Sequence, residues 1–352
     1  MFLKKIKVLV VDDSALMRKI ISDMINSDEE MEVIDIAKNG KDMLEKVNKY
    51  NPDVVTLDVE MPIMDGITAL RELKKSNINT PVIMLSSLSQ SGTALTMECL
   101  ELGAFDFIPK PSGAISLDIN KVRDELVIKI RAAAEKNFSR PIVKESVASV
   151  KIENNSSFRR SISSKIDAVV IGASTGGPKA LYSVVTELPE RLGVPVFIVQ
   201  HMPVGFTKAF AERLNTNSKI KVVEACDGQI IEKDVVYIAP GGFHMEVSGD
   251  NRIHLNTEPS IWGVRPAVDK LFQSAIKLYN SHLLSIVLTG MGKDGAQGTA
   301  DIKKCGGITI SEDKSTCTIY GMPKAAFETG MVDMVLPLQE VAPQIIKTVY
   351  GR

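Results

Sequence analysis

Apolar residues in the first third of the chain form short runs that alternate with amphipathic segments. Short apolar runs bounded by turn residues are typical of strands buried on both faces of a sheet, and spacings of three and four indicate helices packed on them. Successive βα units of this kind predict a parallel sheet covered on both faces. We expect strands at Lys7–Val11, Glu32–Ala37, Asp53–Leu57, Pro81–Leu85 and Ala104–Ile108, and a last helix near Ile119–Ala134.

The periodicity stops near Asn137 and resumes near Ile166. The stretch between is rich in serine with scattered charge, which indicates a flexible linker. Renewed βα alternation then predicts a second doubly wound, Rossmann-like domain. We therefore divide the chain into a five-stranded flavodoxin-like α/β domain (1–135), a linker (136–165) and a second α/β domain (166–352). In the second domain we expect strands at Asp167–Ile171, Pro195–Gln200, Val235–Ile238, Leu284–Leu288 and Ile308–Ile310, and a hairpin of Met245–Val247 and Ile253–Leu255 around Asn251.

The composition is that of an ordinary globular protein, with 44% hydrophobic and 24% charged residues among 352. There is no apolar run long enough to span a membrane. The apolar run in Met1–Val11 meets two aspartates at once, which argues against a signal peptide. The cysteines form no C-x-x-C pair or zinc spacing, so we expect a reducing, cytoplasmic setting. They are Cys99, Cys226, Cys305 and Cys317.

Charge is distributed unevenly along the chain. Lys and Arg against Asp and Glu number 17 to 22 in residues 1–135, 7 to 2 in residues 136–165, and 18 to 19 in residues 166–352. A nearly neutral second domain lacks the clustered cations that nucleic-acid binding needs. It also has no recognisable helix-turn-helix, so a transcription factor is disfavoured. We expect a monomer that binds no nucleic acid.

Chemically active side chains gather at the strand ends of the first domain. Asp12 and Asp13 follow the first strand, Asp58 the third, Ser86 the fourth and Lys110 the fifth. Carboxyl ends of parallel strands meet at one edge of the sheet. Three carboxylates there favour a hard cation such as Mg²⁺, for which Asp12, Asp13 and Asp58 are the candidate ligands. Asp58 is then the natural acceptor of a phosphoryl group, while at the same edge Lys110 can neutralise further charge and the Ser86 hydroxyl can bond a phosphoryl oxygen.

These residues lie in motifs that resemble the response-regulator receiver family over residues 5–130. The resemblance implies that a histidine kinase phosphorylates Asp58 and that Phe107 is the aromatic switch residue. On spacing alone, Phe107 is only a core aromatic. The matching motifs are Val10–Ser14, Leu57–Gly66, Leu85–Ser87 and Gly103–Pro111.

A glycine-rich turn follows the first strand of the second domain, at Gly172–Gly177. It fits the G-x-S-x-G pattern, in which glycines allow a tight turn that exposes the central serine, here Ser174. Turns of this kind also bind phosphates at helix N-termini. A phosphorylation-regulated nucleotide-binding module without hydrolase activity is therefore the alternative.

A serine nucleophile needs a base, and the chain has four histidines. His201 directly follows a buried strand, which places it on the same sheet edge as Ser174, so we favour it as general base. His244, in a loop after two glycines, is the competitor. The two others, His254 in a hairpin strand and His282 before a strand, are poorly placed.

The base needs an orienting acid, and Asp294 follows another buried strand in a glycine-rich turn. Its carboxylate would fix the His201 tautomer, and the turn leaves backbone N–H groups free as oxyanion donors. The alternative is that Asp294 only caps the following helix. Asp294 can both orient His201 and cap the helix only if one carboxylate oxygen serves each role.

The second domain resembles the chemotaxis-type protein-glutamate methylesterase family over about residues 166–348. The resemblance implies Ser174 as nucleophile, His201 as base and Asp294 as acid. It also places the Met291 N–H in the oxyanion hole and Thr175 beside the nucleophile. The implied substrates are glutamyl methyl esters on chemoreceptors, with glutamine deamidation left open, and the implied partners are those receptors and a chemotaxis histidine kinase. The matching motifs are Gly172–Gly177, Gln200–Pro203, Ala239–His244, Thr289–Gly295 and Tyr320–Pro323.

Overall fold

The structure is a computed structural model that describes residues 5–111, 119–138 and 165–351. The chain forms two compact units that divide between Ser139 and Arg140. We call them the N-terminal and the C-terminal unit and describe each by itself.

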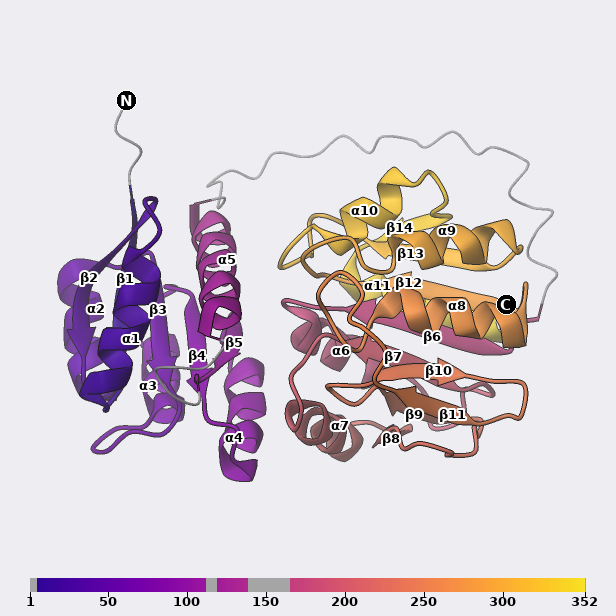
Figure 1. Cartoon of the computed structure of the whole chain (residues 1–352), viewed down its shortest axis with the longest axis horizontal. Helices are drawn as coiled ribbons and strands as arrows, with labels where there is room; N and C mark the ends of the chain where they lie inside the picture. Colours follow the sequence, from indigo (N-terminus) through magenta and orange to yellow (C-terminus); the bar gives the residue numbers. More distant parts are fainter. Residues whose placement is uncertain (1–4, 112–118, 139–164, 352) are drawn as a thin grey trace. The chain divides into compact units, whose positions relative to one another are not determined.

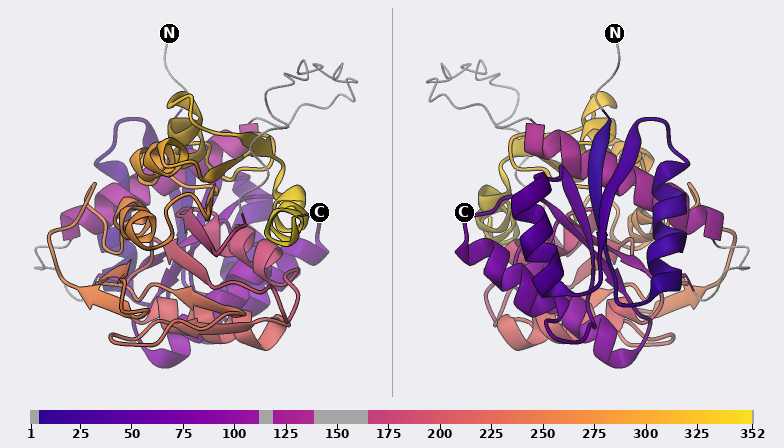
Figure 2. Two further views of the ribbon diagram at one scale, coloured as in Figure 1. Left: turned by 90° about the vertical axis from the view of Figure 1, so that its right-hand side faces the viewer. Right: turned by 90° about the vertical axis from the view of Figure 1, so that its left-hand side faces the viewer.

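The N-terminal unit is a parallel sheet with helices on both faces (Figures 1 and 2). Its five strands are β1 (Ile6–Val11), β2 (Met31–Ala37), β3 (Val54–Asp58), β4 (Val82–Ser86) and β5 (Asp106–Pro109), in the spatial order β2-β1-β3-β4-β5. Its helices are α1 (Ala15–Asn26), α2 (Gly40–Tyr50), α3 (Gly66–Lys75), α4 (Gln90–Glu101) and α5 (Ile119–Phe138). Helices α1 and α5 pack together on one face, and α3 packs between α2 and α4 on the other.

Local sequence explains where these elements form. The central strands are apolar throughout and lose all contact with solvent, as in Val8–Val11 of β1, because helices cover both sheet faces. The helices begin where polar side chains cap them. The Ser14 hydroxyl accepts a hydrogen bond from Met17 N, and the Asp65 carboxylate accepts one from Thr68 N. The strand ends are therefore followed at once by rigid helix starts.

The C-terminal unit contains a larger parallel sheet. Its strands are β6 (Ala168–Ala173), β7 (Val196–Gln200), β8 (Lys221–Glu224), β9 (Val235–Ile238), β12 (Leu283–Val287), β13 (Ile308–Glu312) and β14 (Met334–Leu336). They lie in the order β14-β13-β12-β6-β7-β9-β8, with every neighbouring pair parallel. A separate antiparallel hairpin joins β10 (His244–Val247) and β11 (Ile253–Asn256), and Asn251 in its turn has a positive φ of 59°.

Helices cover both faces of this sheet too (Figure 1). They are α6 (Gly177–Val185), α7 (Phe206–Asn217), α8 (Val268–Tyr279), α9 (Ala296–Lys304), α10 (Met322–Glu328) and α11 (Leu338–Tyr350). Helix α9 packs between α8 and α10, while α6 contacts α7 and α11. Strand β6 has β7 on one side and β12 on the other. Since the chain order reverses at β6, the loops after these three strands converge at a topological switch point.

Both sheets confirm the predicted fold class, and every predicted strand is present. The sequence does not predict β8 or β14, which are the two edge strands of the larger sheet. Helix α5 runs through Phe138, so it extends into the expected linker, and residues 139–164 of that linker lie outside the described residues. Within the described ranges, no helix combines the length and the apolar character that crossing a membrane requires.

Candidate functional sites

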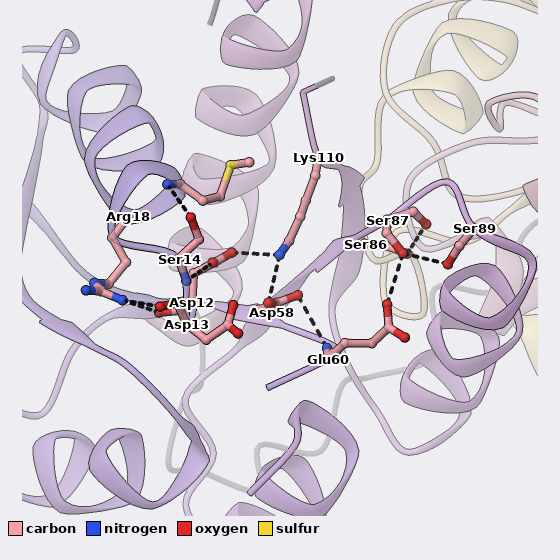
Figure 3. A network of polar contacts seen from close by, with 11 residues as sticks. Asp12, Asp13, Ser14, Arg18, Asp58, Glu60, Ser86, Ser87, Ser89 and Lys110 are labelled. Atoms are coloured by element: carbon pink, nitrogen blue, oxygen red, sulfur yellow. Dashed lines mark hydrogen bonds and ion pairs between the residues drawn. The ribbon is translucent and has the colours of Figure 1, made fainter. Parts of the chain in front are cut away.

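Three aspartates meet at the carboxyl edge of the N-terminal sheet (Figure 3). Asp12 follows β1, Asp13 is next to it, and Asp58 is the last residue of β3. One carboxylate oxygen from each lies within 4.8 Å of the others. Asp12 and Asp58 are buried, whereas Asp13 is exposed. The structure therefore brings together the three aspartates that the sequence predicts as a metal site.

Lys110 binds two of these aspartates. Its Nζ lies 2.8 Å from Asp12 Oδ2 and 2.7 Å from Asp58 Oδ2 (Figure 3). Burial, together with the nearby charge of Asp12, raises the pKa of the Asp58 carboxyl to about 6 against the opposing effect of Lys110. The positive charge of Lys110 thus does not fully offset the rise in the Asp58 pKa that burial causes.

The donor set fits a divalent cation. All three side chains offer carboxylate oxygens, the ligands that Mg²⁺ prefers, and they come from adjacent strand ends. A cation among them would favour the ionised form of Asp58, whose pKa burial has raised. The acidic edge is thus chemically suited to hold Mg²⁺ beside a phosphoryl acceptor.

The two remaining predicted residues of this site, Ser86 and Phe107, are both buried. The Ser86 Oγ lies 2.6 Å from Thr96 Oγ1 in α4 and 3.3 Å from the carbonyl oxygen of Gly92, so it is directed at α4. The ring of Phe107 has Lys129 Nζ 5.3 Å from its centroid, and the same Nζ donates to the Phe107 carbonyl at 2.7 Å. Neither side chain forms a hydrogen bond with Asp58 among the described residues.

In the C-terminal unit, Ser174 directly follows β6 and precedes α6. Its backbone N donates to the Thr289 carbonyl at 3.1 Å, and its side chain is half-buried. Gly176 has a φ of 76°, a left-handed conformation that glycine adopts without strain. Within the described residues the Ser174 hydroxyl forms no hydrogen bond, so the turn presents an unengaged Oγ at the strand end.

The turns after β6 and β12 touch at Ser174 and Gly290. A Cβ atom on Gly290 would lie 2.8 Å from Ser174 Cβ and 2.4 Å from Met322 Sδ, closer than side chains tolerate. Thr289 joins the same two turns, because its Oγ1 donates to the Thr175 carbonyl at 3.0 Å. Glycine at position 290 is therefore what allows the two turns to approach.

His201 follows β7 and contacts Asp294, which follows β12. The Nε2 atom of His201 lies 2.8 Å from Asp294 Oδ2, and the side chains are 11% and 3% exposed. Gln200 ties this pair to the serine turn, since its Nε2 donates to the carbonyls of Ser174 at 2.9 Å and His201 at 3.1 Å. The three predicted residues thus lie on three neighbouring strand ends, with the imidazole bonded to the carboxylate.

Asp294 does cap a helix, but not the one that follows it. Its Oδ2 accepts a hydrogen bond from Val268 N at 2.7 Å and its Oδ1 accepts one from Asp269 N at 2.9 Å, both at the start of α8. Helix α9 begins at Ala296, and its N-cap residue is Gly295, which has no capping side chain. The alternative that Asp294 caps the following helix is therefore wrong. Both carboxylate oxygens of Asp294 accept hydrogen bonds from the start of α8, and Oδ2 also contacts His201.

The competing histidine, His244, is fully buried at the start of β10. Its Nδ1 accepts a hydrogen bond from Ala267 N at 3.2 Å and its Nε2 donates to the Pro259 carbonyl at 3.1 Å. Both ring nitrogens are thus engaged with backbone groups, an arrangement typical of a structural histidine. The other two lie away from these turns, with His254 next to Asp250 and His282 next to Asp167.

The two remaining predicted residues lie beside Ser174. Thr175 is 4% exposed, and its carbonyl accepts from Thr289. Met291 follows Gly290, and no hydrogen bond of the described chain uses its N–H. That N–H is thus available to an incoming oxygen atom.

The sequence does not single out three polar residues that support this site: Gln200, Thr289 and Asp269. Gln200 is the last residue of β7 and Thr289 lies two residues after β12, and a polar residue at the end of a buried strand is a signal that could have found them. Asp269 lies in the first turn of α8, where an acidic residue is common for helix-dipole reasons alone. Its pattern carries no signal of a link to Asp294.

Two family models match the chain. The model described as CheB methylesterase matches residues 169–345, and the model described as response regulator receiver domain matches residues 8–119. A protein-glutamate methylesterase/protein-glutamine glutaminase of Clostridium acetobutylicum is 57% identical over 355 residues, which covers 99% of each chain. A protein of the same description from Pyrococcus horikoshii is 48% identical and covers 98% of this chain and 94% of the relative.

Among solved structures, the Thermotoga maritima CheB methylesterase catalytic domain is similar to the C-terminal unit. It is 43% identical with a TM-score of 0.51, and the match covers 52% of this chain and 98% of that domain. The Clostridium acetobutylicum relative, 57% identical over 99% of both chains, establishes descent from a common ancestor. The chain belongs to the family of CheB-type protein-glutamate methylesterases/protein-glutamine glutaminases, with an N-terminal receiver domain and a C-terminal methylesterase domain.

Proposed function

We propose that this protein hydrolyses glutamyl methyl esters on methyl-accepting chemotaxis receptors, giving glutamate and methanol, and that phosphorylation of its receiver domain activates it. The same acyl chemistry on glutamine side chains would release ammonia. The observation that carries the proposal is the His201–Asp294 contact of 2.8 Å beside the Ser174 turn, in a chain of this family. The activity serves adaptation in chemotaxis.

Ser174 is the nucleophile of this mechanism, and His201 is the base. Because His201 Nε2 faces Asp294, Nδ1 is the ring nitrogen that takes the Ser174 proton as Oγ attacks the ester carbonyl. The carboxylate of Asp294 stabilises the resulting imidazolium. His201 then protonates the departing methoxide, and methanol leaves an acyl-enzyme. Water, deprotonated by His201, attacks this ester and restores Ser174.

The developing oxyanion needs donors that are already in position. The N–H of Met291 is unused within the described chain and lies in the turn that touches Ser174 through Gly290. We assign it to the oxyanion hole, with Thr175 beside the nucleophile Ser174. Since the Gly290 carbonyl accepts from Gly321 N and Met322 N, the peptide before Met291 is fixed. Such pre-oriented donors lower the barrier because they need no reorganisation.

In the receiver domain, Asp58 accepts a phosphoryl group from a histidine kinase. Asp12, Asp13 and Asp58 would hold Mg²⁺, which supplies positive charge to the phosphoryl oxygens when bound. Lys110, which already contacts the Asp58 carboxylate, would form an ion pair with an oxygen of the phosphoryl group. Ser86 would turn from Thr96 toward the phosphoryl group, and Phe107 would respond to that movement.

The test is methanol release from a receptor cytoplasmic fragment that carries tritiated methyl esters. We expect release by the wild-type chain, an increase with a small phosphodonor and Mg²⁺, and loss of several orders of magnitude in Ser174→Ala with an unchanged circular dichroism spectrum. Asp58→Asn should keep the basal rate and lose the increase. Undiminished release by Ser174→Ala would refute the serine mechanism, and saturable nucleotide binding without hydrolysis would favour the binding-module alternative.

A further inference from the structure

Two buried carboxylates, those of Asp294 and Asp269, cap each other's helices. Asp294 accepts hydrogen bonds from Val268 N and Asp269 N at the start of α8. Asp269 Oδ1 in turn accepts hydrogen bonds from Gly295 N at 3.0 Å and from Gly298 N at 2.8 Å, at the start of α9. Gly295 is the residue directly after Asp294. Each carboxylate therefore fixes the backbone beside the other.

Neither helix has a capping side chain at its own first position. Ala267 precedes α8 and Gly295 precedes α9, and neither forms a side-chain cap. The first N–H groups of a helix need acceptors, and its N-terminus favours negative charge. The two aspartates, 2% and 4% exposed, meet both needs across a gap of 25 residues. Removing one leaves buried N–H groups of the opposite helix unpaired.

Asp269 also reaches the other side of Asp294. Its Oδ2 accepts a hydrogen bond from the Trp262 indole Nε1 at 3.2 Å. The ring of Trp262 has Lys293 Nζ 3.9 Å from its centroid, and Lys293 is the residue directly before Asp294. Gly295, the residue after Asp294, thus donates to Asp269 itself, and Lys293, the residue before Asp294, contacts the indole ring that donates to Asp269.

This arrangement has an electrostatic cost. Burial raises the pKa of the Asp269 carboxyl, and the charge of Asp294 raises it further. Two nearby buried carboxylates are not what stability alone would favour. The hydrogen bonds that the pair accepts can instead serve to fix the direction of the Asp294 carboxylate.

We propose that Asp269 is the positioning residue of the esterase, because it holds the backbone around Asp294 so that Oδ2 faces His201. This inference rests on the proposed function, in which Asp294 is the catalytic acid. Oδ2 accepts from Val268 N as well as contacting His201. A shift of α8 relative to α9 would therefore draw Oδ2 away from the imidazole, and small misplacements of catalytic groups are costly.

The experiment compares variants of the full chain by methanol release from the tritiated receptor fragment, at several substrate concentrations and across pH. Asp269→Ala removes the acceptor, and Asp269→Glu keeps the charge but displaces it by one methylene group. Asp269→Asn keeps a carbonyl oxygen for Gly295 N and Gly298 N. Ser274→Ala is the matched control, since Ser274 lies on the same helix and its buried Oγ accepts from Val247 N at 3.1 Å. Thermal melting reports the folded fraction of each variant.

We expect Asp269→Ala and Asp269→Glu to lower kcat by about 10- to 100-fold with little change in KM. We expect the pH profile of kcat/KM to change as well, because a displaced Asp294 carboxylate no longer holds the His201 imidazole in one position. Asp269→Asn should restore most of kcat and the original profile. Ser274→Ala should lower the melting temperature and leave kcat and the profile unchanged.

Two outcomes would overturn the proposal. One is a wild-type kcat and pH profile in Asp269→Glu, which also decides the question if Asp269→Ala does not fold. The other is an equal effect of Asp269→Ala and Ser274→Ala once the folded fraction is taken into account. An Asp294→Asn arm separates the two levels of inference. If that variant is fully active, the role of Asp294 fails; if it is inactive while the Asp269 variants are normal, only the positioning role fails.

Discussion

The imidazole of His201 lies 2.8 Å from the carboxylate of Asp294, through Nε2 and Oδ2. The contact is nearly closed to solvent, with the His201 side chain 11% exposed. A carboxylate in this position accepts only, so it keeps a proton on Nε2 and leaves Nδ1 as the acceptor for Ser174. In the proposed mechanism, the pair would therefore set the direction of proton transfer.

Replacing Asp294 with asparagine should disturb that direction. The amide can donate to Nε2 and stabilise the other tautomer, so we expect kcat to fall by roughly 10³–10⁴-fold. Rapid-mix single-turnover methanol release measures this loss directly.

The double variant Ser174→Ala/His201→Gln should be no slower than Ser174→Ala, because residues that act as a unit are not additive. A multiplicative loss would mean that the two residues act independently.

The two histidines near the site should give opposite results. His244 supports Ala267 N and the Pro259 carbonyl, so His244→Ala should lower the free energy of unfolding by about 2–4 kcal/mol, from unpaired backbone groups and lost packing. His201→Ala should remove activity and change stability far less. Urea unfolding and methanol release on the same preparations separate the two effects, and the reverse pattern would make His244 the base.

A methyl group on Gly290 should disable the site. In Gly290→Ala the new Cβ would meet Ser174 Cβ and Met322 Sδ, so the serine turn and the Met291 N–H must move apart. We expect kcat to fall at least about 100-fold, as for a displaced catalytic group or oxyanion donor. Gly249→Ala is the control, because a Cβ there meets nothing within 4 Å. Equal activity of the two variants would contradict the close packing of the turns.

The stability of the receiver domain should depend on pH through Asp58. Its pKa is raised to about 6 in the folded chain, mainly by burial, from a reference value of 3.8. Between these values the folded state binds more protons than the unfolded state, so this group makes stability fall as pH rises. Asp58→Asn cannot ionise. At pH 7.5 it should therefore be more stable than the wild type by up to about 3 kcal/mol, with a smaller difference at pH 5.

Mg²⁺ should stabilise the wild-type receiver domain more than it stabilises Asp58→Asn at pH 7.5. A divalent cation among Asp12, Asp13 and Asp58 stabilises the ionised carboxylate, so millimolar Mg²⁺ should raise the melting temperature at pH 7.5. Asp58→Asn should gain much less. Melting curves with Mg²⁺ and with EDTA provide the measurement. An equal gain in both proteins would place the cation elsewhere.

Much of this molecule could be predicted from the pattern of apolar runs. The central strands β6, β7 and β12 are buried and largely apolar, and the candidate catalytic residues lie in the turns that follow them. The edge strands β8 and β14 gave no such signal. Edge positions pair on one side only, so their sequences are not constrained to be apolar throughout, and β14 is half-buried along its length.

The hydrogen bonds that hold the candidate catalytic residues in place could not be predicted in the same way. Helix caps are recognised in sequence from residues next to the helix they cap. The link from Asp269 to Gly295 and from Asp294 to Val268 joins helices across 26 residues in each direction. Only the packing of α8 against α9 brings these ends together. The same limit applies to His244, whose role follows from which backbone groups surround it.

The position of β6 at the reversal of strand order has a consequence for how this family can diversify. The candidate catalytic side chains all follow strands near the middle of the sheet, while β8 and β14 form its margins. Insertions or exchanges at the margins can reshape the outer surface without disturbing the turns that hold Ser174, His201 and Asp294. The outer surface and the candidate site can therefore evolve on separate parts of one fold.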